Sequence, residues 1–252
     1  MINRGSVDVF ESMENRILCS LRAEQRGRLG SRLDSVNLSP GLALYEAGDT
    51  VNSVFFPNSG VVSLLSCTEE GQSVEVAMTG VEGMVGVPVA LRTDTIPYRA
   101  LVQTAGVALR LDAGVFKDEL ARGGILQEQV LRYTAALIGA ISQSATCNRF
   151  HTVKERLCRW LLVACDRACL DSFSLTQEFL SNVIGSSRQG VNEAVASLQR
   201  DGMISCERSS ITVLDQDALE SGACECYILL KQAYDEYLRS CSRLSSRAMS
   251  AT

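Results

Sequence analysis

The sequence has a single histidine and four prolines in 252 residues, and it lacks an apolar run as long as the ~18–20 residues of a membrane-spanning helix. Residues 1–20 carry charges and show no apolar signal-peptide core. We therefore expect a cytoplasmic protein with no membrane partner. The chain also has no glycine-rich phosphate loop and no acid–base pair beside a nucleophile, so an enzyme is not expected.

The sequence has no excess of basic residues. Lys and Arg number 24 and Asp and Glu number 29, which gives a net charge of −5. A general nucleic-acid coat is usually basic, so that class is disfavoured. A sequence-specific DNA binder is not excluded, because a few well-placed cations and contacts to base edges can supply its affinity. Apolar residues make up 46% and charged residues 21%, which is typical of one or two globular domains.

The cysteines do not form the CxxC…CxxC pattern of a zinc ribbon, although there are ten of them. Cys158, Cys165 and Cys169 are spaced to share one helix face, and Cys224-x-Cys226 is a separate pair. Without a signal peptide, a disulfide framework is not expected. We predict buried thiols that behave as small apolar groups, with no metal site and no cofactor. A metal or iron–sulfur site is the alternative.

Residues 175–198 have the pattern of a helix-turn-helix. Thr176 is a candidate N-cap for a first helix that ends at about residue 184. Gly185 suits the sharp turn, because a residue without Cβ is favoured there. Ser186 or Ser187 can cap the second helix, and their hydroxyl groups also suit a phosphate oxygen.

The second helix of this motif has two distinct faces. Its apolar stripe follows the spacing i, i+3, i+4, i+7, at Val191, Ala194, Val195 and Leu198. The opposite face carries side chains that can bond to base edges in the major groove: Arg188, Gln189, Asn192 and Glu193. An ordinary helical hairpin with a solvated polar face is the alternative. A predicted β-hairpin follows, with strands at 203–204 and 211–214, and it favours a winged helix. Arg208 in the wing turn and Thr176 at the start of the first helix are further candidate DNA contacts.

The region from residue 40 to 111 consists of short apolar runs separated by glycine-containing turns. These runs lie at 43–45, 54–56, 60–65, 73–78, 100–103 and 108–111. Many short strands at this spacing predict an antiparallel sandwich or barrel. Residues 1–35 are polar with apolar anchors, and we expect them to be helical.

Helical periodicity returns after residue 124. Apolar and small residues step by three and four, a spacing suited to a seam between two helices, at Leu131, Thr134, Ile138, Ile141 and Ala145. This pattern predicts a homodimer, and the alternative is a helix packed on its own domain. A further helix is expected at 150–168 and a last one at 226–238, followed by a loose tail from residue 240.

This order of elements resembles the Crp–Fnr family of bacterial transcription regulators. The resemblance covers residues 15–220, and its most specific parts are GLALYEAGDTVNSVFFPNSGVVSLL, EGMVGV, FHTVKERLCRWLL and the helix-turn-helix. It implies an α+β fold: an antiparallel, cupin-like β-roll in residues 1–119, a dimerisation helix in 120–149, a winged helix-turn-helix in 150–220 and a C-terminal helix in 221–252. It also implies homodimers that read a palindromic operator in double-stranded DNA, with RNA polymerase as a further partner.

The roll departs from the pattern of the family's cyclic-nucleotide binders. Those proteins have Gly-Glu-Leu, where Glu holds the ribose, but this chain has Gly83-Met84-Val85, and Met84 is not a carboxylate. The phosphate-binding arginine aligns one place late, in Tyr98-Arg99-Ala100, and one residue reverses the face of a strand. We therefore expect no cyclic AMP binding of the usual kind. The candidate effector contacts remain Gly83, Met84, Val85, Arg99 and Ala100.

Two other kinds of regulation remain open from the sequence. The roll could respond to a non-standard nucleotide or another small anion, with Arg99 as its contact. Alternatively, the regulator could respond to redox state or metal through its cysteines, with Cys206 on the wing as the best-placed thiol. An N-terminal iron–sulfur cluster of the family's kind is not expected, because Cys19 is the lone cysteine there.

Overall fold

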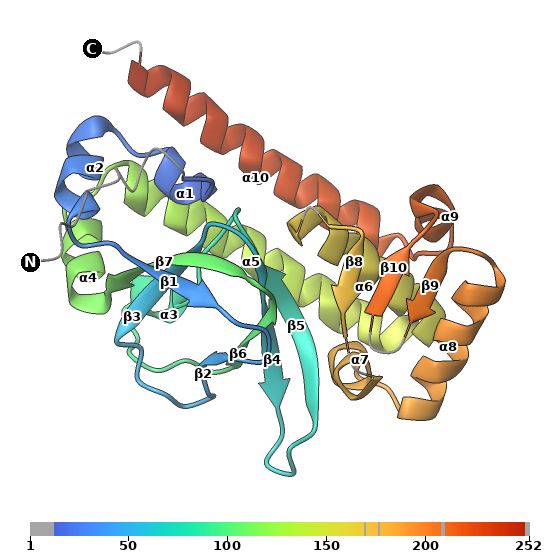
Figure 1. Cartoon of the computed structure of the whole chain (residues 1–252). Helices are drawn as coiled ribbons and strands as arrows, with labels where there is room; N and C mark the ends of the chain where they lie inside the picture. Colours follow the sequence, from blue (N-terminus) through green and yellow to red (C-terminus); the bar gives the residue numbers. More distant parts are fainter. Residues whose placement is uncertain (1–12, 169, 176, 208–209, 250–252) are drawn as a thin grey trace, which may run out of the picture.

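The computed structural model describes residues 13–168, 170–175, 177–207 and 210–249, with side chains to residue 239. The chain forms a β-roll, a long central helix, the predicted DNA-binding part and a second long helix (Figure 1). Within the described residues, no helix is long and apolar enough to cross a membrane.

The β-roll consists of two antiparallel sheets packed face to face. One has the order β1 (Asp34–Leu38), β7 (Gly106–Asp112) and β3 (Ser53–Pro57). The other has the order β2 (Ala43–Tyr45), β6 (Arg99–Thr104), β4 (Val61–Cys67) and β5 (Ser73–Thr79). The predicted antiparallel architecture is therefore confirmed. Residues 61–65 are all buried, because β4 lies between β6 and β5 in its sheet and α6 also packs against it. This explains why four of these five residues are apolar.

Short helices close the ends of the roll. They are α1 (Arg16–Cys19), α2 (Ala23–Gly30), α3 (Val87–Ala90) and α4 (Ala113–Ala121). The expectation of helix throughout residues 1–35 is wrong at its end, because β1 begins at Asp34 and pairs with β7. A five-residue strand with mostly exposed side chains leaves little periodic signal.

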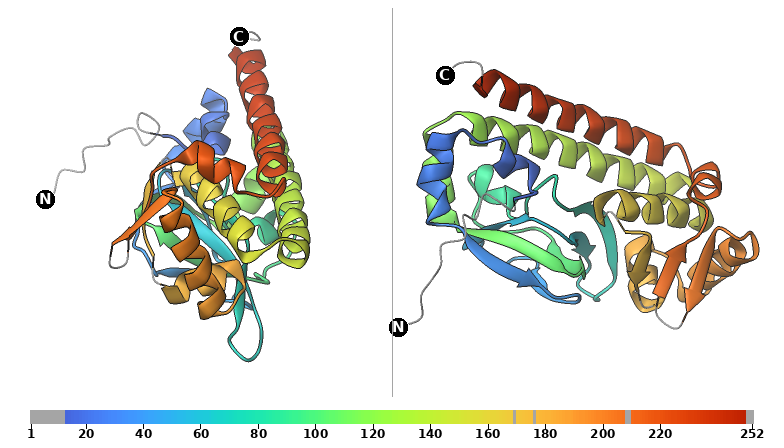
Figure 2. Two further views of the ribbon diagram at one scale, coloured as in Figure 1. Left: turned by 90° about the vertical axis from the view of Figure 1, so that its right-hand side faces the viewer. Right: turned by 45° about the horizontal axis from the view of Figure 1, so that its top comes forward.

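Two long helices lie side by side along the molecule (Figures 1 and 2). Helix α5 (Ile125–Phe150) runs from the roll to the DNA-binding part, and α10 (Cys226–Met249) returns antiparallel to it. The prediction of a loose tail from residue 240 is wrong, because the backbone stays helical to Met249. No glycine or proline interrupts residues 226–249, so no local signal ends the helix earlier.

The DNA-binding part follows α5. It contains α6 (Val153–Ala168), β8 (Ser172–Ser174), α7 (Gln177–Ile184), α8 (Arg188–Arg200), β9 (Ile204–Glu207), β10 (Ser210–Val213) and α9 (Gln216–Ser221). Thr152 and Glu155 form a reciprocal capping box at the start of α6. Strands β9 and β10 form the predicted wing, and β8 joins β10 as a third strand.

Candidate nucleic-acid interface

The turn between α7 and α8 is built by two local signals. Gly185 has a φ of 63°, a left-handed conformation that favours glycine. Ser187 is the N-cap of α8, and its Oγ accepts a hydrogen bond from the backbone N–H of Gly190 at 3.1 Å. The neighbouring Ser186 is half-buried.

Helix α8 buries one face and exposes the other. Val191, Ala194 and Leu198 are buried against the rest of the DNA-binding part, and Val195 is half-buried. The exposed face begins in the first turn and carries the predicted base-contacting side chains: Arg188, Gln189, Asn192 and Glu193. The buried stripe thus fixes which side of α8 faces solvent, and that side holds donors and acceptors.

Two of these exposed side chains are paired with acidic partners. The guanidinium of Arg188 lies 3.1 Å from Glu178 Oε1, at the start of α7, and both side chains are about two-thirds exposed. Gln189 donates from Nε2 to Glu193 Oε1 at 2.9 Å. Exposed ion pairs are weak, about 0–1 kcal/mol, so a DNA phosphate or base can displace Glu178 from Arg188 at little cost.

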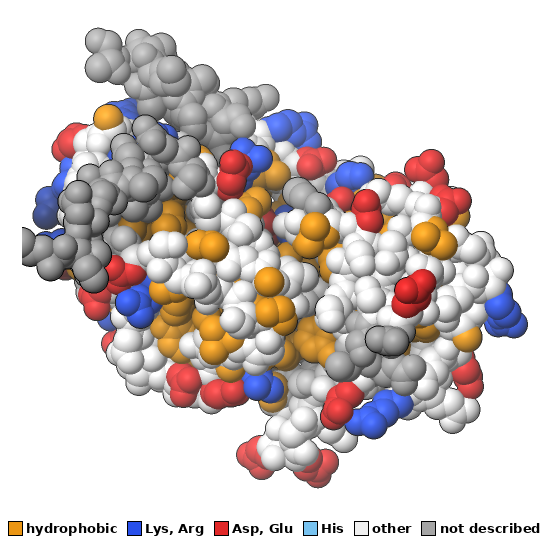
Figure 3. Space-filling model, in the orientation of Figure 1, with side chains coloured by type: hydrophobic (Ala, Val, Ile, Leu, Met, Phe, Trp, Pro, Cys, Tyr) orange, Lys and Arg blue, Asp and Glu red, His pale blue; other side chains and the backbone are white. Residues whose placement is uncertain are grey.

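Charges of both signs are interspersed around this surface. Lys154, at the start of α6, pairs with Asp201 at 2.7 Å at the end of α8. In the view of Figure 3, acidic and basic side chains alternate over the roll and the DNA-binding part. This mixed charge favours DNA recognition through individual side-chain contacts, because the described part of this surface has no broad positive potential to attract DNA. The predicted contacts Thr176 and Arg208 lie outside the described residues.

The helix-turn-helix rests on the roll. A Cβ atom added to Gly185 would lie 2.8 Å from Val74 Cγ2 on β5, so the turn of the motif touches the β4–β5 hairpin. An open cavity of about 560 Å³ lies beside this contact, between the hairpin and residues 181–187. Deeper in the molecule, Arg167 of α6 pairs with Glu82 at 3.4 Å, and both side chains are largely buried. The DNA-binding part is therefore packed directly on the sensor-like roll.

The comparisons with known proteins agree with this architecture. Residues 35–122 match the family of cyclic nucleotide-binding domains, and residues 155–221 match the family of Crp-like helix-turn-helix domains. A CRP-like cAMP-activated global transcriptional regulator of Mycobacterium tuberculosis is 23% identical over 198 residues, which cover 76% of this chain and 88% of that protein. An anaerobic regulatory protein of Haemophilus influenzae is 21% identical over 183 residues, which cover 70% and 71%.

Solved structures with a similar fold exist. FixK2 from Bradyrhizobium japonicum matches 76% of this chain and 98% of its own chain with a TM-score of 0.65 at 13% identity. The two domain families together cover more than half of the sequence, in the order roll and then helix-turn-helix. The chain belongs to the Crp–Fnr family. It is a CRP-like transcription regulator with a helix-turn-helix DNA-binding domain.

Most of the candidate effector residues lie in the interior of the roll. Met84, Val85 and Ala100 are completely buried. A Cβ added to Gly83 would lie 2.2 Å from the ring of Tyr133, which reaches in from α5 and is also completely buried. These candidate effector residues are therefore packed against protein side chains and present no surface to a ligand.

Arg99, the other candidate effector contact, is paired with an acidic side chain. Its Nε lies 3.1 Å from Glu46 Oε1, and the two side chains are 38% and 57% exposed. The guanidinium is thus paired at the surface, just beyond the end of β2. A bulge in the β2–β6 pairing is present between Ala43 and Tyr45, but it does not separate Arg99 from Glu46.

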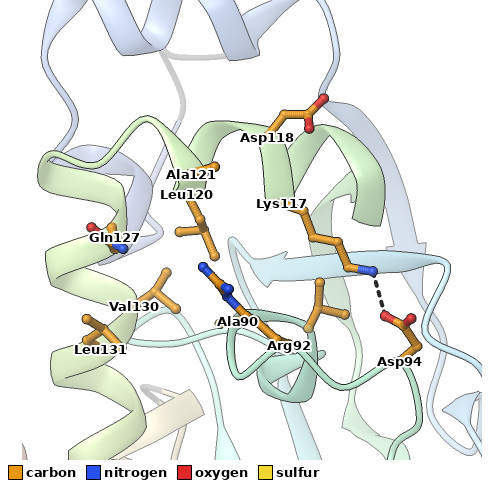
Figure 4. A pocket seen from close by; sticks show the side chains of 11 residues that line it. Ala90, Arg92, Asp94, Lys117, Asp118, Leu120, Ala121, Gln127, Val130 and Leu131 are labelled. Carbon is orange, nitrogen blue, oxygen red and sulfur yellow. Dashed lines mark hydrogen bonds and ion pairs between the residues drawn. The ribbon is translucent and has the colours of Figure 1, made fainter.

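A cavity of about 390 Å³ lies elsewhere on the roll, between α3, α4 and the first turns of α5. Figure 4 shows Arg92 reaching into it and Lys117 paired with Asp94, at 2.5 Å. Two basic and two acidic residues line the cavity, with Asp118 as the second acid, so its charge is balanced. None of the predicted effector residues contributes to this lining.

The predicted dimer seam on α5 divides between two faces. Leu131 and Ile138 are 51% and 57% exposed, and Ala145 is exposed. Thr134 is buried inside the protomer, where its Oγ1 donates to the carbonyl of Val130, and Ile141 is half-buried. The seam prediction is therefore wrong for Thr134, because other parts of the same chain already cover that side of the helix. For Ile141 it stays a prediction.

Sequence reasoning did not find a cluster of three cysteines and the histidine. Cys147 lies in the last turn of α5 and His151 directly after it. They meet Cys224, just before α10, and Cys226, its first residue. Cys158 and Cys165, predicted to share a helix face, are both buried in α6, and Cys169 lies outside the described residues. The signals that could have found the cluster are the spacings Cys-x3-His and Cys-x-Cys, which are 73 residues apart at their nearest ends.

Proposed function

We propose that this protein is a homodimeric regulator that binds an inverted-repeat operator in double-stranded DNA. The observation that carries the proposal is the exposed polar face of α8. Arg188, Gln189 and Asn192 lie on the solvent side of a helix whose other side is anchored in the core. That geometry leaves the first turns of α8 free to enter a major groove.

A continuous exposed stripe on α5 supports the homodimer. Its members follow a spacing of four and three residues: Leu131, Ala135, Ile138, Ser142 and Ala145. The spacing is that of a coiled-coil seam, and the three small residues of the stripe allow a partner helix to approach closely. Exposed isoleucine and leucine on this stripe lose contact with water when a second copy covers them.

The proposed regulator does not use cyclic AMP in the family's usual way. The M. tuberculosis relative is named as cAMP-activated. In this chain Met84 replaces the ribose-binding carboxylate, the space beside Gly83 holds Tyr133, and Arg99 is paired with Glu46. We also propose RNA polymerase as a protein partner, which the regulator would contact when bound beside a promoter.

A selection experiment tests the DNA-binding part of the proposal. Full-length protein is used to enrich sequences from a random double-stranded library, and affinity is then measured at two salt concentrations. We expect an inverted repeat with half-sites about one helical turn, ~34–36 Å, apart. Enrichment of a single asymmetric half-site, or of no sequence at all, would contradict the proposal.

A further inference from the structure

Four potential metal ligands meet where α5 ends and α10 begins. The Sγ atoms of Cys147, Cys224 and Cys226 and a ring nitrogen of His151 all lie within 4.8 Å of one another. The Cys147 and Cys224 sulfurs are 3.5 Å apart, and Cys226 Sγ is 3.5 Å from His151 Nδ1. The four groups come from two segments that are far apart in sequence and are brought together by the packing of α10 on α5.

These separations fit a single tetrahedral ion. Zn–S bonds of about 2.3 Å place two sulfurs of a tetrahedron about 3.8 Å apart, and a sulfur and a nitrogen slightly closer. The observed 3.5 Å contacts are near those values. An iron–sulfur cluster would spread its ligands over several iron ions and needs them further apart. A disulfide needs sulfurs about 2.05 Å apart, and Cys147 and Cys224 are both free.

The three thiols are buried but are not part of the main apolar core. Cys147 and Cys226 are completely buried, and Cys224 is 6% exposed. Together they form a small cluster of their own, separate from the large cluster that fills the rest of the protein. Thiols that serve only as small apolar groups pack among aliphatic and aromatic side chains. In this protein the three thiols face one another, which is the arrangement expected of metal ligands.

Groups around the cluster orient the ligands. His151 Nε2 lies 3.2 Å from Glu225 Oε2, so the ring can donate its Nε2–H to this carboxylate and leave the Nδ1 lone pair facing Cys226. Gln143 donates from Nε2 to Cys226 Sγ at 2.9 Å. A carboxylate behind a ligating histidine and a donor on a ligating sulfur are the usual outer partners of zinc ligands.

The surroundings also suit the charge of the cluster. Three thiolates around Zn²⁺ carry a net negative charge. Arg156 and Arg159 of α6 are both buried, and their positive charges act on Cys147. These two positive charges offset part of the negative charge of the cluster.

We infer that Cys147, His151, Cys224 and Cys226 form a structural Zn²⁺ site that fastens α10 to α5. Four protein ligands leave no open coordination position, as in structural zinc sites generally. The site joins the end of the central helix, the connection into α6 and the start of the last helix. This inference revises the expectation of no metal site, and it does not depend on the proposed mode of DNA or effector binding.

The experiment measures metal in full-length protein expressed with zinc and purified without chelator. We expect about one zinc per protomer by elemental mass spectrometry. Cys147→Ser and Cys226→Ser should each reduce the zinc content at least about tenfold after dialysis. Cys67→Ser and Cys206→Ser are matched controls outside the cluster, and they should keep the zinc.

A measurement on the native sequence keeps the inference testable if a variant fails to fold. Replacement of zinc by Co²⁺ should give the visible absorption of a tetrahedral cobalt ion together with near-ultraviolet thiolate charge-transfer bands. A strong chelator should lower the melting temperature of the native protein but leave that of Cys147→Ser unchanged, since that variant holds no metal. Zinc retained by Cys147→Ser, a Cys147–Cys224 disulfide in peptide mass spectra, or iron and sulfide in place of zinc would each overturn the inference.

Discussion

Trp160 of α6 donates its indole N–H to Glu75 Oε1 of β5 at 2.8 Å, and this hydrogen bond joins the DNA-binding part to the roll. Trp160 is completely buried, and the second oxygen of Glu75 has no hydrogen-bond partner among the described residues. Burial raises the pKa of Glu75 from 4.5 to about 7, because the ionised carboxylate is poorly solvated there. The contact between the two parts of the molecule is therefore sensitive to pH.

We predict that Glu75 makes the protein less stable as the pH rises. The folded state keeps the proton up to about pH 7, whereas the unfolded chain releases it near 4.5, so the stabilisation is complete below about 4.5 and is lost as the pH rises through 7. Glu75→Gln cannot ionise and keeps an acceptor for Trp160. The free energy of unfolding is measured with denaturant at pH 5.5 and at pH 8. Between these two pH values it should fall by on the order of 1–3 kcal/mol more in wild type than in Glu75→Gln. Equal pH dependence of wild type and Glu75→Gln would show that the pKa of Glu75 is not raised in the folded state.

A second prediction concerns the contact between the helix-turn-helix turn and β5. Gly185→Ala has to adopt a left-handed backbone, at about 1–2 kcal/mol, and its Cβ also meets Val74 at 2.8 Å. Gly202→Ala has a similar φ of 72° with nothing within 4 Å, so it incurs the backbone cost alone. The melting temperature of Gly185→Ala should therefore be lower than that of Gly202→Ala. Val74→Ala in the Gly185→Ala background should recover part of that difference, and no recovery would mean that the contact is not present in solution.

Local signals were sufficient for the helix-turn-helix. Gly185 and Ser187 act within one turn of the chain, and the apolar stripe of α8 faces a single core. The seam on α5 was predicted less well, because the roll, α10 and a proposed second copy of the chain can each pack against that helix. Thr134 and Ala135 are adjacent and both compatible with a seam, and only the docking of the roll and α10 decides which of them is exposed.

Contacts between distant segments could not be read from periodicity. His151 follows α5, and its partner Glu225 lies beyond the whole DNA-binding domain. Whether Cys224 meets Cys147 depends on where α10 returns, which no spacing in the sequence specifies. The candidate effector residues show the same limit. Met84 in place of a carboxylate is visible in the sequence, but the position of Tyr133 in the space beside Gly83 is not.

The third prediction tests the dimer. Ile138→Asp places a charge on the exposed α5 stripe, where it would be desolvated and unpaired between protomers. Because Ile138 is 57% exposed in the single chain, the variant should fold. Sedimentation velocity at micromolar concentration should show a dimer for wild type and a monomer for Ile138→Asp. Leu91→Asp, with a similarly exposed residue on the roll, should remain dimeric. A monomeric wild type, or a dimeric Ile138→Asp, would rule out this seam.

The fourth prediction concerns cyclic nucleotides. Loss of the ribose-binding carboxylate and of the phosphate-binding arginine each removes a charge-assisted contact of ~1.5–3 kcal/mol. Together these losses weaken binding by on the order of a hundredfold or more. Calorimetry with cyclic AMP and cyclic GMP should therefore show no micromolar binding, and Arg99→Ala should leave the result unchanged. Micromolar binding that disappears in Arg99→Ala would show that Arg99 leaves Glu46 to hold the phosphate.

The last prediction separates base reading from phosphate contact at Arg188. This side chain lies in the first turn of α8, and its planar fork can pair with one guanine or with a phosphate. If it reads a base, Arg188→Ala should cost ~1–3 kcal/mol per half-site and relax preference at one symmetric position. If it contacts only phosphate, affinity should fall evenly across sequences, and the salt slope should decrease by roughly one per contact.

Glu178 provides the matched control for this test. In the free protein it neutralises Arg188 across the turn at 3.1 Å. Glu178→Gln removes that competing charge and leaves α8 intact, so it should strengthen DNA binding in either case. In the Arg188→Ala background the same change should strengthen binding less, because no paired arginine remains to be released. Fluorescence anisotropy on the selected operator and on single-base variants measures both effects. Equal affinity and equal sequence preference in all of these variants would show that this face of α8 does not contact DNA.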